Sequence, residues 1–439
     1  MNEQKKELTV WEMIKQFPRT FFKSIFRHGY PNNDVDRSEI VFKNFFLHFH
    51  PVKCHKNALN PFYTLGLGVI TTSLFIILVL TGLVLMFYYI PAEDRAFNIM
   101  KDWQDTVPFA QLFRNMHRWG AHLMVLFTML HMSRVFYTAA YKGERKFNWV
   151  IGIILMVLTL FLSFTGYLLP WDQLAFWAVT VGAEIASYAP NIPGLEYNIN
   201  KVMLLASNSV GQDALIRFYV LHVAVLPLLA GTLIGVHFWR IRKDGGLSRP
   251  PDPVRPYPAR VFQRSDTKEV FAPGVPKTYG LMELVRGSNP QRDQGPHDNV
   301  FTWPHLLRAE MVVFMGTLAL VLCLSFFDAP LEEPANPTKP PNPAKAPWYF
   351  LGLQELVAYS AFWGGVAIPA LMVLGLALIP YFDRNPRGVG IWFHHSRYYA
   401  IFFYTLFMLV QYLLIIIGTY FRGANWNFIW PWTDNFATH

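Results

Sequence analysis

Seven long apolar stretches dominate this sequence. Each is long enough to cross a lipid bilayer as a helix, which requires about 20 residues. Loops rich in proline, glycine and charged residues separate them. The stretches occupy residues 62–90, 116–139, 148–169, 215–239, 305–327, 361–382 and 398–421. The sequence therefore predicts an all-α transmembrane fold with seven spans.

Composition agrees with this prediction and indicates the orientation. The chain is 53% hydrophobic and 15% charged, whereas soluble proteins average about 25% charged residues. Lys and Arg concentrate before the first span and in 140–147, 240–300 and 383–397, and they are sparse in the alternate loops. Because basic loops stay in the cytoplasm, we expect a multi-pass protein of the cell inner (plasma) membrane with a cytoplasmic N-terminus. The net charge of +9 then reflects orientation, and no nucleic-acid partner is expected.

The spans fall into two groups, four before a basic, proline-containing linker and three after it. We expect a cytoplasmic N-terminal segment, a four-helix domain, a cytoplasmic linker and a three-helix C-terminal domain, at residues 1–60, 61–240, 241–300 and 301–439. Residues 8–28 mix aromatic and basic side chains and predict an amphipathic surface helix, in which Pro18 is a residue that can break the helix. Residues 171–200 and 328–347 are predicted to lie at the outer surface.

Four histidines lie inside two of the apolar stretches at nearly matched intervals. His117 and His131 are 14 residues apart in the second stretch, and His222 and His237 are 15 apart in the fourth. A helix rises about 1.5 Å per residue, so each pair spans roughly 21–22 Å and stays near one helix face. Both stretches run from outside to cytoplasm, which pairs His117 with His222 near the outer side and His131 with His237 near the inner side. Imidazole is a common axial ligand of haem iron, so the pattern predicts a clamp for two haems.

A single histidine in an apolar stretch is more often a hydrogen-bonded packing residue than a ligand. Four at paired spacings favour ligation, because ionisable groups inside membranes are rare and usually functional. His122 differs from the four, since it lies about 140° around the helix from His117. We interpret His122 as a structural residue.

Glycines repeat the same interval in the first and third stretches. Gly68 and Gly82 are 14 residues apart, and so are Gly152 and Gly166. A glycine lets a large ring approach the backbone, which favours the haem interpretation. The alternative is that these glycines only let membrane helices pack closely.

Arginines flank the histidines. Arg114 and Arg118 surround His117, Arg134 follows His131, and Arg217 precedes His222. Haem propionates are anionic, and the arginine fork binds carboxylates. Snorkelling of these side chains to the membrane edge is the alternative, and both can hold together.

Several motifs resemble the cytochrome b subunit of cytochrome bc complexes (quinol–cytochrome c oxidoreductases). The 14/15 histidine spacing is similar to the cytochrome b6 type, and the C-terminal half resembles the three-helix subunit IV of the b6f complex, here fused to the first half. The motifs are RNMHRW (114–119), HMSR (131–134), TGYLLPWDQ (165–173), RFYVLH (217–222), HFWRIRKDG (237–245), PWYF (347–350) and GANWNFIWPW (423–432).

The resemblance implies a redox function. Two b-type haems are held in the four-helix bundle, an outer one by His117 and His222 and an inner one by His131 and His237. Quinol is oxidised near the outer face, one electron passes to a Rieske iron–sulfur protein and on to a c-type cytochrome, and the other crosses both haems to an inner quinone site. Proton translocation is coupled to this transfer, and the complex works as a homodimer.

The outer quinol motif departs from the family pattern. The usual Pro-Glu-Trp-Tyr reads Ala346-Pro347-Trp348-Tyr349, so the carboxylate that is thought to accept a quinol proton is missing. Glu355 lies near the start of span six, and we expect it to substitute as the proton acceptor beside Trp348 and Tyr349. A solvated interface glutamate is the alternative. Variant motifs of this kind favour menaquinol as the substrate.

Two further sites remain open. Relatives of the b6 type carry an additional c-type haem on a single cysteine at the start of the first span, where this chain has no cysteine. The nearest is Cys54, which we interpret as an interfacial thiol rather than a haem attachment. Lys243 and Asp244 are candidates for proton delivery to the inner quinone, and ordinary cytoplasmic charges are the alternative.

Two other functional classes are compatible with histidines inside membrane spans. A di-haem membrane anchor of another quinone-linked dehydrogenase fits the histidines, but such anchors are usually shorter and lack the outer Pro-Trp-Tyr loop. A membrane transporter with intramembrane His and Arg is the alternative from another class. It would be favoured by inverted repeats or broken helices, and neither is clear in the sequence.

Overall fold

The computed structural model describes residues 9–25, 30–107, 109–191, 193, 198–207, 209–244, 246–249, 299–385 and 387–432. They belong to two compact units, one drawn from 1–56 with 254–308 and the other from 57–253 with 309–439. Most of the predicted linker 241–300 lies outside the described residues, and the expected four-region division stays a prediction.

Among the described residues, the first unit contains a short sheet, the helices α1 and α2, and the short helical elements η1 (Leu47–Phe49) and η5 (Thr302–Leu306). Helix α1 (Val10–Ile25) continues through Pro18, so this proline does not end it. Helix α2 (Asp34–Lys43) begins at Asn33, whose side chain accepts a hydrogen bond from the Asp36 amide, as N-cap residues do. Strands β1 (Lys53–His55) and β2 (Asn299–Phe301) pair antiparallel, with Cys54 opposite Val300.

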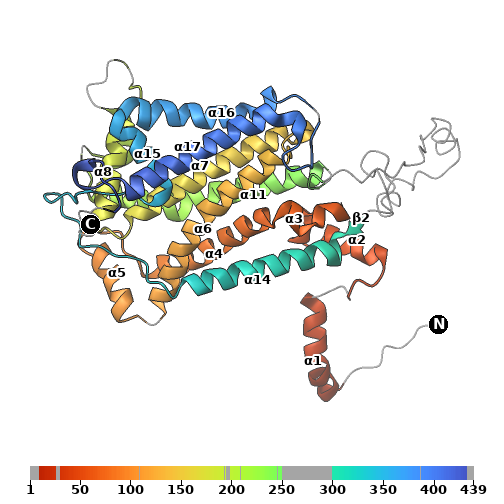
Figure 1. Ribbon diagram of the computed structural model, residues 1–439. Helices are drawn as coiled ribbons and strands as arrows, with labels where there is room; N and C mark the ends of the chain where they lie inside the picture. Colours follow the sequence, from red (N-terminus) through yellow and green to blue (C-terminus); the bar gives the residue numbers. More distant parts are fainter. Residues whose placement is uncertain are drawn as a thin grey trace, which may run out of the picture. The chain divides into compact units, whose positions relative to one another are not determined.

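The second unit is a bundle of long helices that run side by side (Figure 1). The first group of elements is α3 (Pro61–Thr64), α4 (Leu67–Tyr88), α5 (Ala96–Asp105), α6 (Ala110–Tyr137), η3 (Gly143–Arg145), α7 (Lys146–Leu168), α8 (Gln173–Ser187), α9 (Ile199–Leu205), α10 (Gln212–Val220), η4 (Leu221–Val225) and α11 (Leu226–Lys243). The second group is α14 (Leu307–Leu324), α15 (Trp348–Tyr359), η6 (Trp363–Ala367), α16 (Ile368–Phe382), η7 (His395–Arg397), α17 (Tyr398–Tyr420) and η8 (Ala424–Trp426). The predicted all-α transmembrane fold is confirmed.

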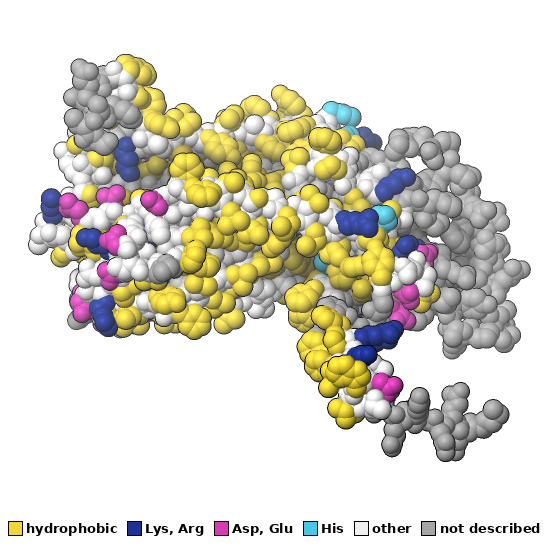
Figure 2. Space-filling view, turned by 90° about the horizontal axis from the view of Figure 1, so that it is seen from below, with side chains coloured by type: hydrophobic (Ala, Val, Ile, Leu, Met, Phe, Trp, Pro, Cys, Tyr) yellow, Lys and Arg dark blue, Asp and Glu magenta, His cyan; other side chains and the backbone are white. Residues whose placement is uncertain are grey.

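Helix neighbours define how the bundle is built. Helix α4 packs along α6, α11 along α7, α16 against α7, and α15 against α17. One apolar cluster joins α6 and α7 to α16 and α17 through residues such as Phe136, Trp149, Leu376 and Tyr404. Hydrophobic side chains cover the flank of the bundle, and charged side chains gather toward its ends (Figure 2). This is the pattern of a surface in contact with lipid.

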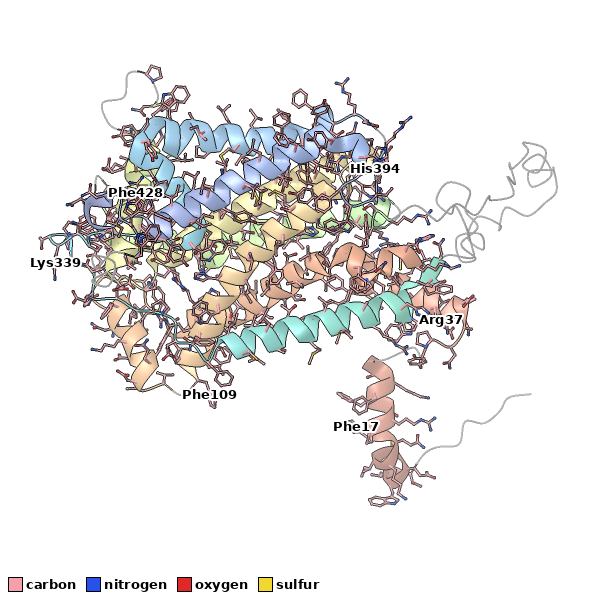
Figure 3. All side chains as sticks on the ribbon, in the orientation of Figure 1. Phe17, Arg37, Phe109, Lys339, His394 and Phe428 are labelled. Carbon is pink, nitrogen blue, oxygen red and sulfur yellow. The ribbon has the colours of Figure 1, made fainter. Side chains whose placement is uncertain are left out.

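The loops between the long helices lie at the two ends of the bundle. Lys339 and Phe428 lie at one end of the bundle, and His394 lies at the opposite end (Figure 3). The loop that contains Lys339 is held to the start of α8, because the Gln173 side chain donates to the Lys339 carbonyl at 2.8 Å. Asp172 forms an isolated bridge with Pro334. The predicted outer loop 328–347 is thereby attached to the Pro-Trp-Asp-Gln motif.

Six described helical segments are long and apolar enough to cross a membrane. They are Leu67–Tyr88, Gly143–Leu168, Gln212–Lys243, Thr302–Leu324, Trp363–Phe382 and His395–Tyr420. The expected second span, α6, has 28 residues and sufficient length, but it carries Arg114, Arg118 and Arg134 within its sequence. Helix α6 is therefore long enough to cross a membrane but less apolar than the other six segments.

The region before span six differs from the sequence-based expectation. Residues Trp348–Tyr359 form a separate helix, α15, and Ser360 is extended with φ −161° and ψ 122°. Glu355 therefore lies on this short helix and not at the start of the span. The predicted sixth stretch begins at residue 361, directly after this break, but no helix was predicted for residues 348–359.

Candidate functional site

The outer pair of histidines faces each other across the bundle. The ring centres of His117 on α6 and His222 on η4 are 6.1 Å apart, with the ring planes inclined by 76°. Two imidazole nitrogens that bind one metal at about 2 Å from opposite sides would place the ring centres roughly 6 Å apart. The spacing fits a shared metal between the two rings.

Hydrogen bonds fix the protonation pattern of this outer pair. His222 Nδ1 lies 3.0 Å from the Leu162 carbonyl, which only accepts, so Nδ1 carries the proton. Thr81 Oγ1 donates to the Ile77 carbonyl at 2.8 Å and lies 2.9 Å from His117 Nδ1, so the hydroxyl accepts from that ring. In both neutral rings Nε2 is then left as the bare nitrogen, which is the form that binds a metal.

The predicted inner histidines lie further along the same two helical segments, α6 and the continuous segment formed by η4 and α11. His131 is on α6 and His237 is on α11. The Nδ1 atoms of both rings are buried without a hydrogen-bond partner within the described ranges. Among the described residues, the inner rings therefore lack the Nδ1 contacts that fix the tautomer of the outer pair.

Each predicted glycine faces one of the four imidazoles. A Cβ at Gly82 would lie 3.1 Å from His117 Cε1, and one at Gly68 would lie 3.3 Å from His131 Cε1. A Cβ at Gly166 would come within 3.0 Å of both nitrogens of His222, whereas one at Gly152 would lie 3.9 Å from His237 Cε1. The shared interval of glycines and histidines therefore corresponds to direct contact between neighbouring helices, tightest at Gly166.

A π-helical turn explains why the second histidine pair is spaced by 15 residues. Residues Leu221–Val225 form this wider turn between α10 and α11, and Pro227 follows it at the start of α11. Proline lacks the N–H that would close the preceding regular turn, and a π turn accommodates one additional residue. Because the π turn absorbs one residue, His222 and His237 keep nearly the same spacing along the helix and the same helix face as His117 and His131, which are 14 residues apart in α6. The sequence signal for this turn was Pro227.

The four predicted arginines separate into two kinds. Arg114 donates to the Ala329 and Pro330 carbonyls at 2.7 Å each, and Arg217 donates to the Met203 carbonyl at 2.7 Å. Arg114 thereby holds the loop that follows α14, and Arg217 holds the end of α9. Arg118 and Arg134 instead have a buried Nε that bonds to nothing among the residues described. Their charged groups lie over the rings of Tyr167 and Tyr63, respectively, so only these two remain candidates for an anionic group.

The Trp348-Tyr349 motif contacts His122, the histidine that was interpreted from the sequence as a structural residue. Trp348 Nε1 donates to His122 Nδ1 at 3.0 Å, and the Tyr349 ring lies edge-on to His122 with centres 5.5 Å apart. Helices α6 and α15 are far apart in sequence, so only the fold shows this contact. The sequence signal that could have identified His122 as a functional residue is that ionisable groups are rare within a membrane span.

Glu355 is engaged differently from the expectation. It is 1% exposed, and Arg422 binds both carboxylate oxygens, with Nε 3.0 Å from Oε2 and Nη2 close to Oε1. Trp426 Nε1 also donates to Oε2 at 3.0 Å. An arginine and an indole thus occupy both carboxylate oxygens, and these contacts do not support a free proton acceptor beside Trp348 and Tyr349.

The remaining predicted residues lie at two different places. The Lys243 ammonium is 5.3 Å from the centre of the Trp239 ring. Asp244 follows at the C-terminal end of α11, where its Oδ2 is buried and makes no hydrogen bond with any described residue. Cys54 is buried in β1, in the other unit. Lys243 and Asp244 are thus adjacent at one helix end, and Cys54 belongs to a separate part of the chain.

Known proteins with similar sequence and structure cover both halves of the chain. The family model described as Cytochrome b/b6/petB matches residues 52–245. Cytochrome b6 of Heliomicrobium gestii is 45% identical over 197 residues, which are 45% of this chain and 88% of that protein. Cytochrome b6 of Heliobacterium modesticaldum is 46% identical over the same shares, and that of Euglena gracilis is 46% identical over 42% of this chain and 84% of its own length.

A solved structure extends the similarity to the C-terminal half. A chain of a hyperthermophilic respiratory complex III aligns with a TM-score of 0.65 and 25% identity, over 94% of this chain and 91% of the other. The two halves therefore share one arrangement with a complex III subunit. The chain belongs to the cytochrome b/b6 family and is the cytochrome b subunit of a bc-type electron-transport complex, with a b6-like first half fused to a subunit-IV-like three-helix half.

Proposed function

We propose that this chain binds two b-type haems and transfers electrons between them across the membrane. His117 and His222 hold the outer haem, and His131 and His237 hold the inner one. The observation that carries the proposal is the 6.1 Å separation of the His117 and His222 ring centres, together with two bare Nε2 atoms. When bound, the haems supply one-electron redox chemistry at two depths. Arg118 and Arg134 are the side chains available for their propionates.

The substrate proposed for this subunit is a quinol, with menaquinol preferred. Quinol is oxidised at the outer side, where Trp348 and Tyr349 lie. One electron would pass to a Rieske iron–sulfur protein and on to a c-type cytochrome. The other would pass to the inner side, where the electrons from two such turnovers and two protons reduce one quinone to quinol. Lys243 and Asp244 are the candidates to deliver protons there, which couples electron transfer to proton translocation. Membership of a bc-type family supports this assignment.

The cellular setting follows from charge and family. The cluster of Lys and Arg in the N-terminal segment and in 383–397 supports a cytoplasmic N-terminus in the cell inner membrane. The Lys339 end of the bundle is then the outer end. We further propose that the complex is a homodimer, as the resemblance implies. Cys54 is not assigned a haem.

Haem stoichiometry in the purified complex tests the proposal. The wild-type chain should contain two b-type haems, measured by chemical extraction and by a reduced-minus-oxidised spectrum. His222→Leu should remove one haem, and His237→Leu should remove the other. His395→Ala, at the exposed first residue of η7, is the matched control and should keep both. A wild-type complex without a b-type signal, or ligand variants that retain two haems, would refute the assignment.

A further inference from the structure

His122 occupies an unusual position within the bundle. It lies on α6, one turn after Arg118 and therefore on the same helix face. Its ring contacts three aromatic side chains, with the Trp119 ring centre 5.5 Å away, Tyr349 edge-on, and the Trp348 indole hydrogen-bonded to Nδ1. An imidazole among aromatic rings inside a membrane span needs a partner for each polar atom.

The bond from Trp348 fixes which nitrogen of His122 carries hydrogen. An indole N–H can only donate, so Nδ1 of His122 must be the acceptor in the 3.0 Å contact. In the neutral ring the hydrogen is then on Nε2. A doubly protonated ring would direct an N–H at the indole N–H and lose this bond. His122 therefore presents one donor, Nε2–H, in a fixed orientation.

This donor is unsatisfied in the part of the chain that the structure describes. His122 Nε2 is buried and makes no hydrogen bond there. A buried N–H without an acceptor costs about 1–3 kcal/mol, so such a group is seldom kept without a ligand to satisfy it. The adjacent rings of Trp348, Tyr349 and Trp119 suit a flat aromatic molecule, and the fixed N–H suits an oxygen on its edge.

We propose that Nε2–H of His122 donates a hydrogen bond to an oxygen of the quinol or quinone head group at the outer site. The proposal rests on the quinol oxidation proposed above and adds a residue that binds and positions the substrate. His122 transfers no proton in this role, because Nδ1 is occupied by Trp348 and Nε2 is already protonated. A carbonyl oxygen is a stronger acceptor than a hydroxyl oxygen, so the site should hold the product quinone at least as firmly as the quinol.

The test compares variants that differ only in this donor. The intact complex is assayed with a short-chain naphthoquinol and the matched benzoquinol, and the corresponding quinones serve as product inhibitors. His122→Phe keeps a flat ring and removes the N–H, and His122→Gln keeps a donor. Trp348→Phe leaves His122 in place but removes the bond that fixes its tautomer. Trp432→Phe, at a position that is 74% exposed, is the control for a change of tryptophan to phenylalanine outside the site.

The expected result is a change in binding with little change in turnover. His122→Phe should raise KM for quinol and the inhibition constant of quinone about tenfold, which corresponds to one lost hydrogen bond, with kcat within about twofold. Trp348→Phe should show a smaller rise in KM, His122→Gln should recover most of the wild-type KM because it keeps a donor, and Trp432→Phe should stay at wild type. Isotope-edited infrared spectra should show one quinone carbonyl band in the wild type that moves to higher frequency in His122→Phe.

The outcomes separate this inference from the proposed function. A wild-type complex without b-type haem or quinol oxidation refutes the function itself. A wild-type complex that oxidises quinol, with His122→Phe unchanged in KM, quinone inhibition and carbonyl band, refutes only the role of His122. If His122→Phe fails to retain haem, Trp348→Phe decides, because it keeps the histidine. An unchanged KM and an unshifted carbonyl band in Trp348→Phe then refute the inference.

Discussion

The guanidinium of Arg422 holds the carboxylate of Glu355 in an ion pair whose side chains are 13% and 1% exposed, respectively. Arg422 also donates to the Trp426 carbonyl at 3.0 Å, so the pair fastens α15 to the segment that follows α17. The Trp-Tyr motif begins α15, and its position therefore depends on this contact. This contact supports a positioning role for Glu355, and the proton-acceptor role expected from sequence stays a prediction.

Glu355→Gln is the substitution that distinguishes these two functions. We expect a loss of stability of roughly 2–3 kcal/mol, because a mostly buried arginine would be left without its countercharge. KM for quinol should change little if the carboxylate takes no proton. The measurement is the thermal loss of b-haem absorbance beside steady-state kinetics. The double variant Glu355→Gln with Arg422→Met should recover part of the stability. A fall in kcat at normal stability would restore the proton-acceptor interpretation.

The sequence was sufficient for the features that depend on composition and period. Apolar length identified the spans, and the intervals of the glycines matched the histidines that they contact in the structure. It was insufficient for residues 348–359, which lie before the predicted sixth stretch and form a separate helix, α15. It was also insufficient where a side chain has a partner far away in the sequence.

Arginines show this second limit most clearly. Arg114 and Arg217 look the same as Arg118 and Arg134 in sequence, since all four flank a histidine. The first two bond to backbone carbonyls, and a carbonyl acceptor can be supplied by any residue type. No residue pattern could therefore predict which arginines remain available for a ligand. The same reason concealed the contact between His122 and Trp348.

Glycine contact distances predict unequal sensitivity to a methyl group. Gly166→Ala should displace His222, since the new Cβ would come within 3.0 Å of both ring nitrogens, and the outer haem should be lost. Gly152→Ala should be tolerated, because 3.9 Å from His237 is an ordinary contact. Gly235→Ala, with no atom within 4 Å of its Cβ, is the control. Haem content per chain distinguishes them, and equal retention in Gly166→Ala and Gly235→Ala would contradict the prediction.

The π turn at Leu221–Val225 predicts an asymmetric response to changes in helix length. Deletion of Ala224 together with Pro227→Ala should convert the segment to a regular helix with a 14-residue histidine interval, and both haems should remain. Insertion of one alanine after Leu126 in α6 should rotate His131 by about 100° relative to His117 and remove one haem. The measurement is haem stoichiometry after purification. Loss of haem from the deletion variant would show that the π turn does more than absorb one residue.

Asp383 provides a prediction for pH. Burial alone would raise the pKa of this carboxyl, but hydrogen bonds from Tyr141 and Lys142 outweigh burial and hold the pKa below its ordinary value. Arg397 Nε lies 3.2 Å from its Oδ2, and the Lys142 ammonium lies 2.9 Å from its Oδ1. A carboxyl with a lowered pKa in the folded state stabilises the protein above its unfolded pKa, near 4. That stabilisation is lost as the pH falls through the lower folded pKa.

Asp383→Asn should therefore remove a stabilising term that depends on pH. At pH 7 the variant should lose about 3–5 kcal/mol, because Lys142 and Arg397 remain buried without their countercharge. The difference between wild type and variant should stay constant above about pH 5 and shrink below about pH 4. Thermal loss of b-haem absorbance across this pH range measures it, with Asp213→Asn at an exposed position as the control. A difference that did not change with pH would mean that Asp383 contributes through packing or uncharged hydrogen bonds and not through its charge.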